Sequence, residues 1–325
     1  MIITRTPLRI SFAGGGTDLP SFYRSYGGGA VVSAAIDRYI HVLVNDKFDR
    51  SIRVAYSRTE NVDRLEELQH GLVREAMRVT GVTDSLEVHT VADIPSEGTG
   101  LGSSSTLTVG LLNALYAHRG VLHDPRALAE EACRIEIDIL HGTLGKQDQY
   151  IAAFGGLKFI EFQSDDSVRV TPIPLSRDDR RSLEGHLSLY YTGVTRQAQG
   201  ILKTQDSRTE RNREALVRMR AMAGECRSLF LKHDWPGVGA LLDEGWTLKK
   251  ALTDGISTPS IDQAYAAAKS AGAYGGKITG AGGGGFLLVM HPPERSREIE
   301  KALSPMHRLA VGIDAEGSRI LFVGR

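Results

Sequence analysis

The chain has 325 residues, and 39 lysines and arginines are balanced by 39 aspartates and glutamates. This neutral balance gives no support for a nucleic-acid-binding protein or a membrane-surface protein. Hydrophobic residues make up 41% and charged residues 24%, which is typical of a soluble globular protein. No apolar run approaches the ~18 residues of a membrane span, and the length predicts two domains.

The cysteines and histidines predict a cytoplasmic protein without a dedicated metal cluster. Cys133 and Cys226 are far apart and fall in helical patterns, so we expect buried, reduced thiols. The N-terminus has no signal-peptide profile. The ten histidines show no metal-binding spacing, so any metal should be an oxygen-bound cation brought by a nucleotide. A homo-oligomer is compatible with the sequence but not indicated by it.

The hydrophobic patterns predict a mixed α/β chain in both halves. In the first half we expect strands at 2–12, 30–36, 39–44, 52–56, 86–91, 155–162 and 168–173, and helices at 63–79, 104–118 and 125–140. In the second half we expect strands at 187–191, 286–291, 309–313 and 319–323, and helices at 208–232, 235–252 and 261–271. The polar segment 176–185 predicts a boundary between domains 1–185 and 186–325.

A loop rich in glycine and serine is the most informative motif, and it opens directly into the helix expected at 104–118. Its members are Gly98, Gly100, Leu101, Gly102, Ser103, Ser104 and Ser105. Glycines let a backbone approach a ligand closely, and the free amides at a helix N-terminus bind phosphate. The loop lacks the lysine of a Walker A sequence. It predicts a nucleotide phosphate loop, and the alternative is a glycine turn with an ordinary serine cap.

Two further glycine motifs flank this loop in sequence. The first includes Gly14, Gly15, Gly16, Thr17 and Asp18, after a strand that carries Arg9. It predicts a turn where a small ligand approaches the backbone and Asp18 accepts sugar hydroxyls. A dinucleotide fingerprint fits poorly, because the third glycine position is Leu19. The last motif, 275–286, includes Gly280, Gly282, Gly283 and Gly284 and predicts a backbone that lies against another loop or a ligand.

The segment 136–150 supplies acidic side chains that could take part in catalysis. Glu136 is expected at a helix end, where it could face the phosphate loop as a cation ligand. Asp148 is expected in a loop beside Lys146, where its carboxylate could take a hydroxyl proton. Taken alone, each is better explained as a surface carboxylate.

Taken in order, these motifs resemble those of the GHMP kinases, the family of galactokinase, homoserine kinase, mevalonate kinase and phosphomevalonate kinase. The resemblance covers nearly the whole chain. It implies an α/β (α+β) fold of two domains, the first like domain 2 of ribosomal protein S5 and the second ferredoxin-like. It also implies an ATP-dependent kinase that uses Mg²⁺, with ATP and a small-molecule acceptor in the cleft between the domains.

The resemblance assigns roles to individual residues. Asp148 matches the catalytic aspartate and Arg9 the arginine that orients the accepting hydroxyl. Ser104 and Glu136 match the Mg²⁺ ligands, with Asp138 as the rival of Glu136. Asp18 matches the sugar-binding aspartate of the galactokinase branch, and the glycines at 280–284 match the motif behind the phosphate loop.

Within the family, segments 5–20, 145–150 and 191–196 resemble the branch that phosphorylates the anomeric hydroxyl of D-glycero-D-manno-heptose 7-phosphate. The product of that branch is used for GDP-heptose and surface polysaccharide. The galactokinase glutamate is replaced by glycine here, which argues against galactose. A fucokinase-like sugar kinase and a catalytically silent ATP-binding regulator are the alternatives. The candidates for binding the distal phosphate are Arg196, Lys203, Arg24 and Lys146.

Overall fold

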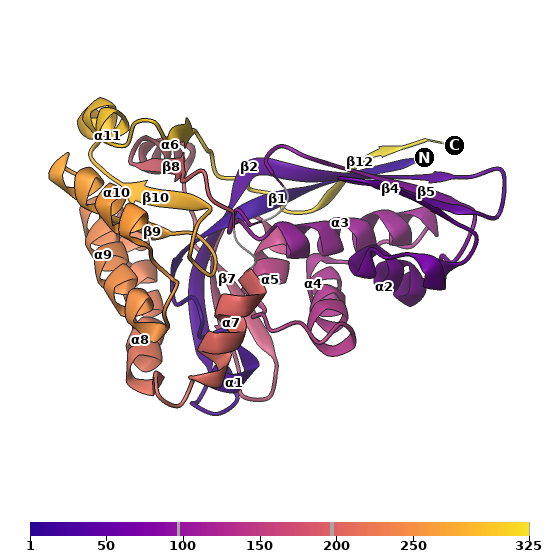
Figure 1. Ribbon diagram of the computed structural model, residues 1–325, viewed down its shortest axis with the longest axis horizontal. Helices are drawn as coiled ribbons and strands as arrows, with labels where there is room; N and C mark the ends of the chain where they lie inside the picture. The colour runs from indigo at the N-terminus through magenta and orange to yellow at the C-terminus, as the bar shows by residue number, and fades with distance from the viewer. Residues whose placement is uncertain (96–97, 196–197, 325) are drawn as a thin grey trace.

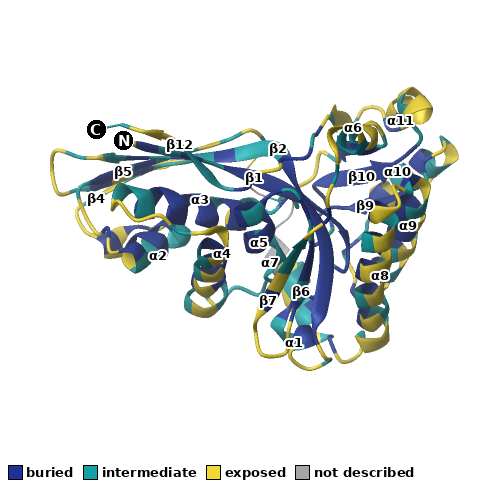
Figure 2. Ribbon diagram, turned by 180° about the vertical axis from the view of Figure 1, so that it is seen from behind, coloured by how far each residue is buried: buried dark blue, intermediate teal, exposed yellow. Residues whose placement is uncertain are grey.

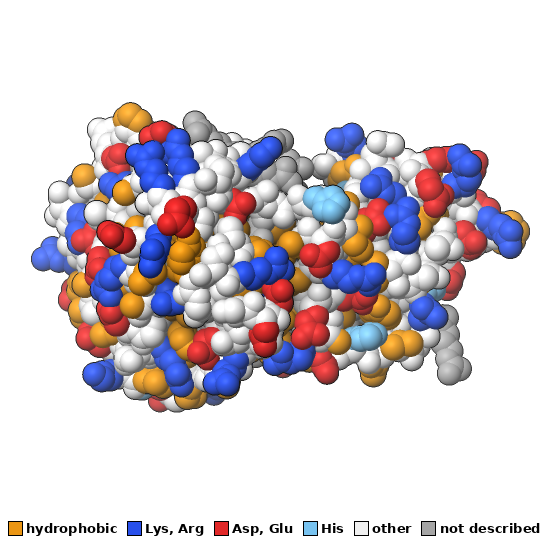
Figure 3. All heavy atoms as spheres, turned by 90° about the horizontal axis from the view of Figure 1, so that it is seen from below, with side chains coloured by type: hydrophobic (Ala, Val, Ile, Leu, Met, Phe, Trp, Pro, Cys, Tyr) orange, Lys and Arg blue, Asp and Glu red, His pale blue; other side chains and the backbone are white. Residues whose placement is uncertain are grey.

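The protein is described by a computed structural model that covers residues 1–95, 98–195 and 198–324. Two β-sheets, each covered by helices, form two lobes that meet along the long strands β1 and β2 (Figure 1). The described part of the chain contains no helix that is both long enough and apolar enough to cross a bilayer. Side chains of both charge signs are interspersed over the face seen from below (Figure 3).

The larger sheet is built around β1 and β2, in the order β12-β1-β2-β5-β3-β4, with β6 on the other end of β2 and β7 next to β6. Its strands are β1 (Ile2–Ala13), β2 (Gly29–Asp46), β3 (Ile52–Ala55), β4 (Thr59–Val62), β5 (Leu86–Ala92), β6 (Leu157–Phe162), β7 (Val168–Pro172) and β12 (Arg319–Val323). The first part of β2 pairs with β6 and its last part pairs with β5. The smaller sheet is antiparallel, in the order β11-β8-β10-β9. Its strands are β8 (Leu187–Tyr191), β9 (Gly275–Ile278), β10 (Phe286–Met290) and β11 (His307–Leu309).

Helices cover both lobes. In the first lobe they are α1 (Pro20–Tyr23), α2 (Gly71–Thr80), α3 (Ser103–His118), α4 (Pro125–Cys133) with the π-helical turn Arg134–Ile139, and α5 (Gln147–Phe154), and a 3₁₀ turn lies at Leu65–Glu67. Helix α6 (Arg177–Gly185) packs on β8 of the second lobe (Figure 1). The helices that follow it are α7 (Ala198–Ser207), α8 (Arg213–Leu231), α9 (Trp235–Leu252), α10 (Pro259–Ser270) and α11 (Ser296–Ala302), with a 3₁₀ turn at Pro293–Arg295. Proline in the first turn starts α4, α9 and α10 after a capping Asp124, Asp234 and Thr258.

The hydrophobic core is continuous between the lobes. Helix α3 packs on β1 and β2 of the first sheet, and α8 packs on the same strands from the second lobe. The ring of Phe12 in β1 meets the ring of Phe230 in α8 edge to face, with centroids 4.9 Å apart. The buried β1 and β2 therefore lie between helices whose outer faces are exposed (Figure 2).

Most of the expected elements are present, and the differences have local causes. The strands expected at 30–36 and 39–44 are one continuous strand, β2, which stays paired with β1 through a register shift. The polar segment 176–185 is helix α6, started by a capping box of Ser176 and Asp179. The strand expected at 309–313 ends at Leu309, and beyond it Ile313 forms a single bridge to Ile36.

The two ends of the chain are neighbours. Strand β12 pairs antiparallel with β1, so the last strand returns to the sheet of the first lobe (Figure 1). The change of sheet between β7 and β8 lies next to the predicted division at 185/186, which stays a proposal. A domain boundary drawn there leaves β12 hydrogen-bonded to the other side.

Candidate active site

The expected phosphate loop forms a bare helix N-terminus. Gly98, Gly100 and Gly102 all have positive φ angles, of +69°, +71° and +80°. Gly102 is the N-cap of α3, and no side chain caps this end of the helix. The first amides of an α-helix have no partner within the helix. The first turn, Ser103 to Ser105, lines a cavity of about 480 Å³ and is suited to bind an anionic group there.

The last glycine motif lies against the back of the phosphate loop. A Cβ added to Gly280 would stand 2.5 Å from the Cα of Gly100, and Gly280 has a φ of +63°. The Thr279 hydroxyl donates a hydrogen bond of 3.0 Å to the Thr99 carbonyl. Gly282 and Gly284 also line the cavity, whereas Gly283 turns its amide to the Ile256 carbonyl. The motif therefore supports the loop by direct backbone contact.

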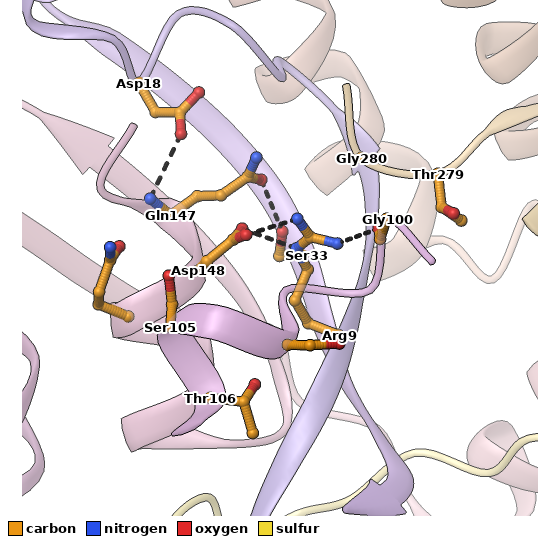
Figure 4. A network of polar contacts seen from close by, with 12 residues as sticks. Arg9, Asp18, Ser33, Gly100, Ser105, Thr106, Gln147, Asp148, Thr279 and Gly280 are labelled. Atoms are coloured by element: carbon orange, nitrogen blue, oxygen red, sulfur yellow. Dashed lines mark hydrogen bonds and ion pairs between the residues drawn. The ribbon is translucent and has the colours of Figure 1, made fainter. Parts of the chain in front are cut away.

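Arg9 and Asp148, which both line the cavity, form a bidentate ion pair (Figure 4). The Nε and Nη2 atoms of Arg9 donate to the two carboxylate oxygens of Asp148 over 2.7 and 2.6 Å. The third nitrogen, Nη1, donates to the Gly100 carbonyl over 2.5 Å. Arg9 is buried, and the Asp148 side chain keeps 20% exposure toward the cavity. One arginine thus fixes both the carboxylate and the phosphate loop.

Asp148 does not lie in a loop, as the sequence predicted, but in the first turn of α5. The helix start also positions Asp18, because the amide of Gln147 donates to the Asp18 carboxylate over 3.3 Å. The Gly16 amide donates to the other carboxylate oxygen over 2.9 Å. Burial, and then the nearby charge of Asp148, raise the pKa of Asp18.

The first glycine motif divides between the cavity and the protein interior. Gly15, Gly16 and Asp18 line the cavity. Gly14 and Thr17 do not, because the Thr17 hydroxyl is buried and hydrogen-bonds the carbonyls of Gly14 and Ala30. Both residues stabilise the turn in this structure, and their contact with substrate stays a prediction.

The two candidate carboxylates for the metal lie in different places. Glu136 is buried directly behind Ser105, whose hydroxyl donates to it over 2.7 Å. Thr108 and Gln149 complete its hydrogen bonds. Burial raises the pKa of Glu136 to about 7 despite these donors. Asp138 lines a separate, smaller cavity of about 240 Å³, so Glu136 is the candidate nearer the phosphate loop.

Lys146 points away from the main cavity. Its ammonium donates to the backbone carbonyl and the carboxylate of Asp166 over 3.0 and 3.2 Å. Arg24 binds the same carboxylate. Burial would raise the pKa of Asp166, but these hydrogen bonds and that of Tyr23 outweigh it and lower the pKa to about 2. Arg196 lies outside the described residues.

Sequence reasoning missed two lysines that line the main cavity. Lys249 comes from α9 and Lys277 from β9, and each is 7% exposed. Burial, together with the charge of Arg9, lowers the pKa of both, that of Lys277 to about 8. The only signal in the sequence was the position of Lys277 inside the last glycine motif. Gln147, Gln205 and Thr279 are also part of the polar lining.

A nucleotide-type phosphate loop that shares one cavity with a fixed carboxylate defines a phosphotransferase of small molecules. Comparison with known proteins agrees with that class. The GHMP kinases N terminal domain matches residues 67–156, and GHMP kinases C terminal matches residues 226–306. The chain belongs to the GHMP kinase family. It is a sugar kinase, and ATP is its phosphoryl donor.

Similar proteins include several with sugar acceptors in their names. A D-glycero-alpha-D-manno-heptose 7-phosphate kinase of Campylobacter jejuni is 31% identical over 93% of each chain. An L-fucokinase/L-fucose-1-P guanylyltransferase of Bacteroides fragilis is 29% identical over 92% of this chain and 36% of its own. The crystal structure of a D-glycero-D-manno-heptose 1-phosphate kinase from Bacteroides thetaiotaomicron aligns over the whole of both chains with a TM-score of 0.83 and 26% identity.

Proposed function

We propose that this sugar kinase transfers the γ-phosphoryl group of ATP to the anomeric hydroxyl of D-glycero-D-manno-heptose 7-phosphate, giving the 1,7-bisphosphate. The observation that carries the proposal is the single cavity in which Asp148, held by Arg9, faces the phosphate loop. The name of the Campylobacter jejuni relative supports the choice of acceptor.

The proposed reaction is an in-line displacement at the γ-phosphorus. The triphosphate lies along the phosphate loop, with its charge against the bare N-terminus of α3. Asp148 accepts the proton of the anomeric hydroxyl as the sugar oxygen bonds to phosphorus and the bond to ADP breaks. The anomeric hydroxyl is more acidic than other sugar hydroxyls, so most of the acceleration comes from positioning and charge neutralisation.

Oxygen donors for a magnesium ion that enters with the nucleotide lie at and behind the loop, although the Glu136 carboxylate already accepts hydrogen bonds from Ser105, Thr108 and Gln149. Mg²⁺ prefers carboxylate and hydroxyl oxygens together with substrate phosphates. Ser104, exposed at the start of α3, and Glu136, behind Ser105, are the residues that would hold it. When bound, the ion neutralises charge on the phosphate oxygens.

A second acceptor is suggested by the Bacteroides thetaiotaomicron relative, which is a D-glycero-D-manno-heptose 1-phosphate kinase. The two acceptors differ in which hydroxyl receives the phosphoryl group. The discriminating experiment is ADP release with heptose 7-phosphate, heptose 1-phosphate, fucose and galactose, followed by phosphorus NMR of the product. We expect turnover with the 7-phosphate and a new phosphorus signal coupled to the anomeric proton. Turnover only with the 1-phosphate or with fucose would replace the proposed acceptor, and no ADP release with any sugar would favour a silent ATP-binding regulator.

The product fits a place in the cytoplasm before nucleotide activation of the sugar. A heptose carrying an anomeric phosphate is the type of compound from which GDP-heptose is made for capsule, S-layer or lipopolysaccharide synthesis. This assignment rests on the proposed acceptor.

A further inference from the structure

Lys249 and Lys277 are two buried lysines that lie in the same cavity without a carboxylate partner. Lys249 donates a hydrogen bond to the Gly280 carbonyl. Lys277 has no hydrogen bond or ion pair to any of the residues that the structure describes. By contrast, the neighbouring Lys250 pairs with Asp262 over 3.2 Å, and Lys269 pairs with Asp243 over 3.1 Å.

Burying an ammonium group without a counter-charge costs free energy, and this cost lowers the pKa of both lysines. Burial lowers the pKa of Lys249 well below its ordinary value and that of Lys277 to about 8, and each lysine opposes the charge of Arg9. The carboxylates of the cavity offset this charge only in part, because Asp18 raises the pKa of both lysines less than burial lowers it. Asp148 is occupied by Arg9, and Asp18 accepts hydrogen bonds from backbone amides. The cavity therefore lacks a full counter-charge for the two lysines.

The two lysines come from a different lobe than the expected triphosphate site, although Lys249 also reaches the Gly280 carbonyl behind the phosphate loop. The triphosphate has the amides of the phosphate loop and the start of α3, all from the first lobe. The lysines come from α9 and β9 of the second lobe. Asp18, from the sugar-binding motif, lies close enough to both ammonium groups to raise their pKa values. The two ammonium groups therefore also lie near the part of the cavity, around Asp18, where we expect the acceptor sugar.

We propose that Lys249 and Lys277 bind the phosphate group that the acceptor sugar carries, and that they select phosphorylated over unphosphorylated sugars. This inference rests on the proposed function. A phosphate monoester brings close to two negative charges and three acceptor oxygens, which two ammonium groups can share. The lysines replace the basic residues expected from the sequence. Arg24 and Lys146 bind Asp166 outside the main cavity, and Lys203 is exposed.

The test compares Lys249→Met and Lys277→Met with the wild-type enzyme on D-glycero-D-manno-heptose 7-phosphate and on the same heptose without phosphate. Methionine keeps the length of the buried side chain and removes its charge. We expect kcat/KM for the phosphorylated sugar to fall roughly 10–100-fold for each variant. The value for the unphosphorylated sugar and the dissociation constant of ATP should change less than about twofold. Lys250→Met is the matched control one residue away and should behave like the wild type.

Equal losses on both sugars, or weaker ATP binding with an unchanged response to the sugars, would overturn the inference. Melting temperatures show whether each variant is folded, and either lysine variant alone suffices for the comparison.

A binding measurement separates this inference from the proposed function. The dissociation constant of heptose 7-phosphate is measured by calorimetry without ATP, for the wild type and both variants. If the wild type binds the sugar phosphate through the lysines but releases no ADP, the inference stands and the proposed function fails. If it turns the sugar phosphate over and the variants bind it as tightly, the function stands and the inference fails. A wild type that does not bind the sugar phosphate overturns both.

Discussion

Arg9 holds the Asp148 carboxylate through two parallel hydrogen bonds, although the two residues are 139 positions apart in the chain. The same guanidinium donates to the Gly100 carbonyl in the phosphate loop. Planar bidentate pairs fix orientation as well as charge. The carboxylate and the loop are therefore in position before any substrate enters, which is how an enzyme lowers the entropic part of a barrier.

Removing the carboxylate charge tests the role of Asp148. We expect Asp148→Asn to lower kcat by roughly 10²–10⁴-fold, because an amide cannot accept the hydroxyl proton. ATP binding should persist, since the phosphate loop is unchanged. ADP release gives kcat, and calorimetry gives the dissociation constant of ATP. Asp84→Asn, on an exposed turn, is the matched control. A near-normal kcat would remove Asp148 from the proposed chemistry.

A double-mutant cycle measures the ion pair itself. Arg9→Gln and Asp148→Asn each leave one charge of the pair without its partner, whereas the double variant removes both charges. We expect the free energies of unfolding to be non-additive, with a coupling of about 0.5–3 kcal/mol. Urea unfolding of the four proteins provides the numbers. Additive effects would show that the pair contributes nothing to stability beyond its separate members.

Gly280→Ala tests the contact between the last glycine motif and the phosphate loop. The new Cβ would meet the Cα of Gly100 at 2.5 Å, so the loop has to move. We expect a lower melting temperature and weaker ATP binding. Gly120→Ala is the control, because Gly120 has a similar positive φ of +75° but no atom within 4 Å. It should show only the backbone strain of about 1–2 kcal/mol. Equal effects of the two changes on ATP binding would contradict the supporting role.

The magnesium requirement should distinguish Glu136 from Asp138. Glu136→Gln keeps the shape of the buried side chain but removes the charge behind Ser105. We expect the Mg²⁺ concentration for half-maximal activity to rise roughly 10–100-fold. Asp138→Asn, in the separate smaller cavity, should leave this concentration unchanged. The opposite outcome would assign the metal to Asp138.

Lys277 should make stability depend on alkaline pH. Its pKa is about 8 in the folded protein, against 10.5 for an unperturbed lysine, so the unfolded chain holds more protons between these values. The contribution of Lys277 to the free energy of unfolding therefore increases as the pH rises from about 8 to 10.5. Over this range, the free energy of unfolding of the wild type should increase by on the order of 2–3 kcal/mol relative to that of Lys277→Met. Urea unfolding at about pH 7.5 and about pH 10.5, on either side of this range, measures the difference. If the free energies of unfolding of the wild type and Lys277→Met differ by the same amount at both pH values, the pKa of Lys277 is not lowered in the folded protein.

The glycine motifs and their order could be predicted from the sequence because their signals are local. Glycine permits the positive φ angles at Gly100 and Gly280, and the free amides at Ser103 follow from the start of a helix. The hydrophobic periods of the longer helices and strands likewise depend on neighbours along the chain. These features were enough to predict the fold class and the resemblance to the family.

Contacts between distant segments were decided only by the tertiary structure. The hydrophobic period of α9 marks its apolar face, but it cannot show that Lys249 rather than Lys250 enters a cavity formed with the other lobe. Local sequence patterns also cannot show that Glu136 contacts Ser105 or that β12 pairs with β1. Burial and charge pairing depend on which surfaces pack together, and that packing is a property of the whole chain rather than of any one segment.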